Sequence, residues 1–143
     1  MHPGERLRRL WEAHGSAREG APTAALDYLE RELRVDLPLQ LRSYLSIVDG
    51  MTSGAWVGNE IEFWPVARIL QEAHEWESFE PGKAGTLLPF ADFLINSHAY
   101  AIRVSWSDAP VFSLHGGGVE IPCATSFDDF VTRYEQGHQS LYG

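Results

Sequence analysis

The stretch LPLQLRSYLSIVDG, residues 37–50, decides the fold, because it has a clear beginning, an apolar side and an end. Its apolar residues recur at helical spacing and form one stripe, made of Leu37, Leu41, Tyr44, Leu45 and Val48. Asp36 stands where an N-cap acceptor would stand, and Pro38 suits the first helical turn. Asp49-Gly50 then provides a stop. We expect an amphipathic helix of about three turns that packs on the main core.

Two further helices are expected before this one, so that helices fill the first third of the chain. The first begins at Pro3 and ends at Gly15, and the second runs from about Thr23 to Leu33. In both, Leu residues return every three or four positions, which is typical of a helix with one buried face.

After Gly50 the pattern changes to short β-prone runs. Residues 55–64 predict a hairpin around Gly58-Asn59, and residues 66–76 have helical spacing. Four candidate strands follow within residues 87–124, and the short loops between them favour antiparallel neighbours. A closing helix is expected between Ser126 as its N-cap and Gly137. The sequence thus predicts an α+β fold: a central antiparallel sheet of about five or six strands with helices packed at both chain ends.

Length and composition indicate one domain spanning residues 1–143, with ordinary hydrophobic content. The chain has no run of about 18 apolar residues and one cysteine, Cys123, so we expect a cytoplasmic protein with no disulfide. In residues 1–42 seven acidic residues balance seven Arg, so the whole net charge of −9 lies in residues 43–143. Such a surface disfavours nucleic acid and anionic membranes and favours a basic protein partner, although acidity can also serve solubility alone.

The order of several short motifs is similar to that of the SUKH superfamily, the Smi/Knr group of cell-wall regulators and bacterial immunity proteins. Leu37-Pro38 with Asp49-Gly50 resembles its opening helix, and Phe63-Trp64 resembles its aromatic strand. The other matching motifs are Ala91-Asp92 in a later strand and Ser126-Phe127 with Phe130 in the closing helix. The resemblance covers about residues 25–135. The turn at residues 96–98 departs from the glycine-rich pattern of the family.

This resemblance implies a binding domain without catalytic activity. In many bacterial members it implies an immunity protein that neutralises a cognate toxin, often a nuclease or another intracellular toxin. The alternative is a regulatory or scaffolding domain of the Smi/Knr type that binds housekeeping partners or a small ligand, and an apolar pocket between sheet and helices would favour that alternative. We expect no cofactor, no metal ligands and no catalytic residues.

Parts of known catalytic and metal-binding motifs occur in the sequence, but none of these motifs is complete. His115 and the three glycines after it spell part of an esterase oxyanion hole, but no G-x-S-x-G nucleophile elbow accompanies them, so a hairpin turn is the better interpretation. The histidines and Cys123 lack metal-ligand spacing, and a buried, unreactive thiol is expected at Cys123. Asp92 with His98 or His115 could form an acid/base pair, but a structural role for Asp92 as a hydrogen-bond acceptor is preferred.

Aromatic anchors surrounded by acidic residues are typical of protein-binding surfaces, because rings contribute burial energy and charges guide approach. On that basis the residues expected to contact a partner are Trp56, Glu60, Glu62, Trp64, Glu75, Trp76, Glu77, His98 and Asp108. The other possibility is that these rings belong to the core. The residues expected to have structural roles are Asp49, Gly50, Asp92 and Ser126.

Overall fold

The computed structural model of the chain describes residues 1–53, 60–79, 86–94, 97–104 and 109–142. The helices are α1 (Pro3–Ala13), α2 (Thr23–Leu33), α3 (Leu39–Ile47), α4 (Val66–Phe79) and α5 (Phe127–Gln136), with short 3₁₀ turns η2 (Gly116–Gly118) and η3 (Gln139–Leu141). The strands are β1 (Ile61–Phe63), β2 (Leu87–Phe93), β3 (His98–Arg103), β4 (Val111–His115) and β5 (Val119–Ala124). Within the described ranges, no helix is long and apolar enough to cross a membrane.

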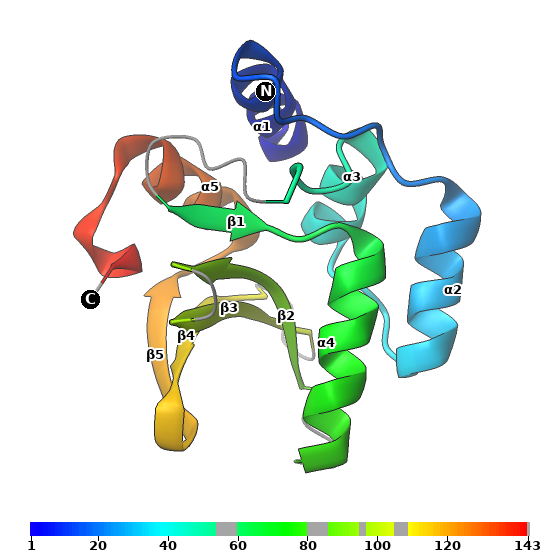
Figure 1. The fold of residues 1–143 in the computed structure, drawn as a ribbon, viewed down its shortest axis with the longest axis vertical. Helices are drawn as coiled ribbons and strands as arrows, with labels where there is room; N and C mark the ends of the chain where they lie inside the picture. The colour runs from blue at the N-terminus through cyan, green and yellow to red at the C-terminus, as the bar shows by residue number, and fades with distance from the viewer. Residues whose placement is uncertain (54–59, 80–85, 95–96, 105–108, 143) are drawn as a thin grey trace.

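The five strands form one sheet in the order β1-β2-β3-β4-β5, and every neighbouring pair is antiparallel. In Figure 1 helices from both ends of the chain, α1 and α3 at the start and α5 near the end, gather at one end of the sheet, while α4 stands beside β2 and next to α2. The α+β prediction is therefore confirmed. The hairpin expected around Gly58-Asn59 lies outside the described residues.

The core lies between the sheet and helices α1, α3 and α5, and aromatic rings fill its centre. Phe63 of β1 is fully buried, with its ring centroid 5.1 Å from that of Trp11 and 4.8 Å from that of Tyr134. The Trp11 indole donates a hydrogen bond to the Tyr134 hydroxyl at 3.0 Å, which satisfies its polar atom inside the core. The core thus joins the two ends of the chain.

The helix expected over residues 37–50 is present as α3, and its apolar stripe is buried from Leu37 to Val48. Its start differs from the prediction, because Pro38 and not Asp36 occupies the N-cap, with no side-chain hydrogen bond there. The residue before a proline is pushed towards extended backbone, so Leu37 cannot begin a helix. The helix therefore begins at Leu39.

The pair Asp49-Gly50 does more than end α3. Val48 closes the helix in an extended conformation, and Gly50 follows with φ +67°. Asp49 Oδ1 accepts a hydrogen bond of 2.7 Å from the Val66 backbone N–H, the first residue of α4. A Cβ on Gly50 would lie 2.6 Å from the Pro65 nitrogen, so the two chain segments touch backbone to backbone. Both residues, for which structural roles were expected, therefore lie in the contact between the end of α3 and the start of α4.

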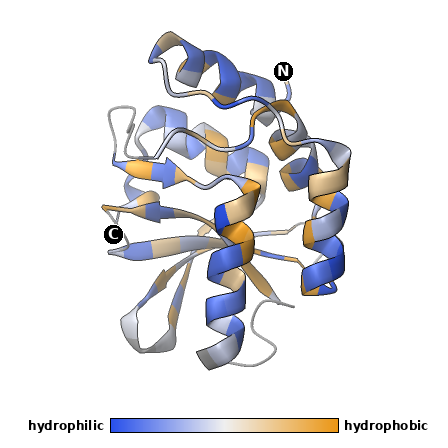
Figure 2. Ribbon diagram, turned by 45° about the vertical axis from the view of Figure 1, so that its right-hand side comes forward, coloured by the Kyte–Doolittle hydropathy of each residue, from blue (hydrophilic) through white to orange (hydrophobic). Residues whose placement is uncertain are grey.

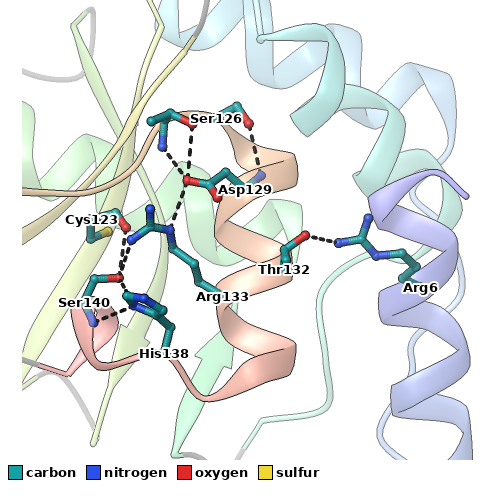
Figure 3. Close-up of polar contacts among 9 residues, drawn as sticks. Arg6, Cys123, Ser126, Asp129, Thr132, Arg133, His138 and Ser140 are labelled. Carbon is teal, nitrogen blue, oxygen red and sulfur yellow. Dashed lines mark hydrogen bonds and ion pairs between the residues drawn. The ribbon is translucent and has the colours of Figure 1, made fainter.

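Helix α5 begins and ends as its sequence indicates. Ser126 accepts a hydrogen bond from the Asp129 N–H at 3.0 Å, and Asp129 in turn accepts one from the Thr125 N–H at 2.9 Å. Figure 3 shows Arg133 between Asp129 and Ser140, and Arg6 of α1 reaching Thr132. Gly137 ends the helix in the left-handed conformation.

The contact at Gly50 gives a stability prediction. Gly50→Ala combines a left-handed φ with a clash against backbone, so we expect the free energy of unfolding to fall by at least about 3 kcal/mol. Gly15→Ala is the matched control, since Gly15 has φ +69° but no neighbouring atom of the described residues within 4 Å of an added methyl group, and about 1 kcal/mol is expected there. Urea titration of both variants measures the difference, and equal losses would contradict the contact.

Candidate partner-binding site

The structure divides the nine residues expected to contact a partner into three groups. Glu60, Glu75 and Glu77 are exposed, and Trp76 is half-buried. Trp56 and Asp108 lie outside the described residues. The buried ones are Glu62, Trp64 and His98, with exposed fractions of 7%, 1% and 8%. The prediction is corrected for these last three, because they do not offer their side chains to a partner in this conformation.

Glu62 and Trp64 are buried because α4 folds over them and brings Arg68 against both. The Arg68 guanidinium contacts Glu62 Oε2 at 2.6 Å and Asp92 Oδ2 at 3.2 Å, and it lies over the Trp64 ring, 4.5 Å from the centroid. Glu62 and Asp92 are directly opposite one another in the β1–β2 register. One guanidinium thus holds two neighbouring strands and the first turns of α4 together, and we call this group the Arg68 cluster.

The Arg68 cluster has more negative than positive charge. Glu72, one helical turn further along α4, lies 3.8 Å from Arg68 and is the third carboxylate beside this single guanidinium. Burial raises the pKa of Glu72, and Glu75 and Asp92 raise it further, while Arg68 lowers it. Burying charged groups in this way costs free energy unless they are paired and hydrogen-bonded, so the cluster depends on Arg68.

A partial signal for this role of Arg68 is present in the sequence. An Arg four residues before Glu72 in a helix indicates a favourable pair. That spacing does not reveal that β1 and β2 bring Glu62 and Asp92 to the same Arg, since those contacts span the chain. Asp92, for which a structural role was expected, is 2% exposed and forms an ion pair with Arg68.

Beyond the Arg68 cluster, α4 presents acidic side chains to solvent. We call Glu75, Trp76 and Glu77 the α4 acidic face. Trp76 packs its inner side against Leu87, Ala101 and Phe112 of the sheet, which fixes the helix and leaves part of the ring accessible. In Figure 2 most of the lower turns of α4 are hydrophilic, in contrast to its first turns. An anchored ring among carboxylates can contact an apolar group and a cation together.

His98 is buried in an aromatic group at the opposite end of β3 from Arg103. Its ring stacks on Phe93, with centroids 5.0 Å apart, and lies 4.6 Å from the ring of His115. Its Nε2 is 3.1 Å from the Tyr100 hydroxyl, which donates a hydrogen bond to the Leu141 carbonyl. His98 therefore contributes to holding the C-terminal turn η3 against the sheet.

The arrangement does not support the acid/base pair of Asp92 with His98 or His115. Asp92 is paired with Ala99 in the β2–β3 register, so it points to the other face of the sheet from His98, and it is occupied by Arg68. His115 contacts Ser113 Oγ at 3.0 Å, and the glycines after it form the turn η2 between β4 and β5, as expected. Burial raises the pKa of the Cys123 thiol to about 12, which keeps it unreactive. No group of three metal-ligating side chains occurs among the described residues.

The comparisons with known proteins agree with the order of motifs. Residues 20–133 match the model of the SMI1 / KNR4 family (SUKH-1). This match includes α3, the Arg68 cluster, the whole sheet and most of α5. A comparison with curated proteins finds no match.

The Arg68 cluster gives a second stability prediction. Arg68→Met keeps much of the side-chain volume but removes the guanidinium that pairs with the buried carboxylates of Glu62 and Asp92, so we expect a loss of about 3–5 kcal/mol in the free energy of unfolding. Arg8→Met is the control, because the exposed Arg8–Glu12 pair should change stability by less than about 1 kcal/mol. Chemical denaturation followed by tryptophan fluorescence measures both, and a loss as small as that of the control would contradict the cluster.

The environment of His98 predicts a pH dependence. Burial lowers the pKa of His98 below its ordinary 6.5, and His115 lowers it further, while Leu141 and Asp92 raise it. The folded state thus binds this proton more weakly than the unfolded state, so stability is full above pH 6.5 and falls as the pH drops below it. His98→Gln should flatten this slope between about pH 7 and 5, whereas the exposed His14→Gln should leave it unchanged. Unfolding titrations at several pH values measure the slope.

Proposed function

Because the chain belongs to the SMI1/KNR4 (SUKH-1) family, we propose that it is an immunity protein that neutralises a cognate intracellular toxin by binding and occluding it. It acts without catalysing a reaction, and its partner is a basic protein. The α4 acidic face is the surface that makes first contact. The observation that carries the proposal is the exposure of Glu75 and Glu77 beside the anchored ring of Trp76.

Charge supports a basic partner. The whole net charge of −9 lies in residues 43–143, which include α4. Opposite charges raise the rate of encounter between proteins and suppress encounters with acidic ones. Toxins that act on nucleic acid have to bind phosphates, so their active surfaces tend to be basic, and an acidic protein can cover such a surface directly.

The packing beneath α4 supports a binding role as well. Arg68 fixes the first turns of the helix on β1 and β2, and Trp76 fixes a later turn on the sheet. A surface that is rigid before binding loses less conformational entropy when a partner arrives. The acidic side chains are thus presented on a scaffold that needs little rearrangement.

A second candidate function is a regulatory or scaffolding domain that binds a housekeeping partner or a small ligand. A cavity of about 770 Å³ favours it, at the junction of the start of α3, the end of β3 and the start of α5. Pro38, Ile102 and Phe127 are among its lining residues, and Leu39 at its rim is 81% exposed. This volume is in the usual range for small-molecule sites.

The toxin proposal is tested by charge reversal. Proteins captured by the tagged chain in its source organism are expressed singly in a bacterial host, and the expected partner is a basic protein that stops growth unless this chain is co-expressed. Glu75→Arg with Glu77→Arg should then slow association by about tenfold or more at low salt and flatten its salt dependence. Stopped-flow fluorescence of Trp76 and its neighbours measures the rate.

The matched control is Glu5→Arg with Glu19→Arg, which changes the net charge equally at exposed positions in the first third of the chain. If both pairs of substitutions slow association equally, α4 is not part of the interface. Failure of any captured protein to stop growth would contradict the immunity function.

The second candidate predicts the opposite pattern. Leu39→Glu, at the rim of the α3–α5 cavity, should weaken binding of the captured partner at least about tenfold, while the α4 reversal leaves it unchanged. Isothermal titration of the two variants separates the functions, because each leaves the surface required by the other intact.

A further inference from the structure

The outer edge of β5 is open along part of its length. The sheet ends at β5, and residues 119–122 are exposed, with Val119 at 49% and Ile121 at 36%. An exposed strand with β-branched residues can pair with another extended chain, and proteins usually protect such edges. Here Pro122 and Glu120 provide only partial protection.

The rest of this edge and the opposite edge of the sheet are covered. Ser140 of η3 donates a hydrogen bond to the Cys123 carbonyl at 3.2 Å, and Arg133 holds Ser140 at 2.9 Å (Figure 3). At the other end of the sheet, the Met51 N–H donates to the Phe63 carbonyl of β1 at 3.1 Å. In the part of the sheet that the structure describes, residues 119–122 are thus the uncovered stretch of an otherwise protected edge.

A cavity lies beside this open edge. It has a volume of about 590 Å³ and is lined by Pro110, Phe112 and Pro122 together with residues 123–125 and Arg133. Its walls are mostly apolar, and its size is within the range of small-molecule and side-chain pockets. Strand addition combines these two elements: backbone pairing orients the added segment, and a neighbouring pocket selects one of its side chains.

We propose that residues 119–122 of β5 accept an extended segment of a protein partner as a sixth strand, with one apolar side chain of that segment in the cavity at Phe112 and Pro122. The segment carries apolar side chains and one basic side chain. Its apolar residues lie beside Val119 and Ile121, and a basic residue lies beside Glu120. Glu120 pairs with Arg103 at 3.0 Å, and 30% of its side chain is exposed. This inference rests on the proposed function in that both need a basic protein partner.

Charge and size argue for such a partner over a second copy of this chain. Two copies each carry a net charge of −9, and antiparallel pairing of this short edge with itself brings the two Glu120 side chains close together. Four residues of edge also bury far less than the roughly 1,200 Å² of a stable interface. A different protein that also contacts other surfaces of the chain can bury a larger total area.

The test uses the hexapeptide acetyl-Lys-Val-Val-Lys-Val-Lys-amide, whose Val-Val-Lys-Val stretch can pair with residues 122, 121, 120 and 119 in turn, and the whole chain labelled with ¹⁵N. We expect binding with a dissociation constant of about 1 mM or tighter, and hydrogen exchange slowed by at least about tenfold at the amides within residues 119–121 that face the open edge. Val119→Lys with Ile121→Lys should abolish both effects. Ala24→Lys with Tyr28→Lys, which adds the same charge at two exposed residues of α2, should change neither.

Four results would overturn the proposal. Two concern hydrogen exchange: about 10 mM peptide does not slow exchange at these amides, or it slows exchange only on α4. The third is that a peptide with Glu in place of Lys binds equally well. The fourth is that the free chain sediments as a dimer in which residues 119–121 are already protected from exchange. The last result would assign the edge to a second copy.

The proposed function fails separately. If the peptide binds β5 but the chain neutralises no toxin, strand addition at β5 is supported and the immunity function is contradicted. The opposite result has three parts: the chain neutralises a toxin, the Val119→Lys, Ile121→Lys variant neutralises it equally well, and the peptide does not bind. In that case the immunity function is supported and strand addition at β5 is contradicted.

Discussion

The contact between Asp49-Gly50 and the segment Trp64-Pro65-Val66 is the constraint on which the rest of the structure depends. It fixes the end of α3 against the start of α4 through one hydrogen bond to Val66 and a backbone approach that only glycine allows. Burial raises the pKa of Asp49, which shows that the carboxylate is held there at some cost in solvation. With α4 placed in this way, Arg68 necessarily faces β1 and β2.

The Arg68 cluster then holds α4 in one position on β1 and β2. Buried ion pairs seldom add much stability compared with apolar packing, but they require one geometry, since any slip leaves a charge buried alone. In this chain the geometry joins two cross-strand carboxylates to one helix. The exposed acidic residues of α4 are carried on the same helix, so their positions follow from the buried charges beneath them.

Local patterns predicted the helices, the antiparallel sheet and the capping of α5, because periodicity and capping depend on neighbours in sequence. They could not predict the burial of Glu62 and Trp64. In β1 and directly after it, these two side chains alternate with Ile61 and Phe63, and that pattern normally marks a solvent face. The face is covered only because α4 returns across it, a long-range contact with no signal in the strand itself. The ring stacking that buries His98 could not be predicted for the same reason, because it depends on contacts between different strands.

Glu120, within the open edge of β5, lies on the face of the sheet that α4 covers. The β-ladder runs from Glu62 through Asp92, Ala99 and Leu114 to Glu120, and paired residues point to the same face of a sheet. Three strand spacings separate β2 from β5, about 15 Å. A protein interface of ordinary size spans that distance. If one partner contacted the carboxylates of α4 and also extended β5, the two weak contacts would reinforce each other, because the first would raise the effective concentration for the second.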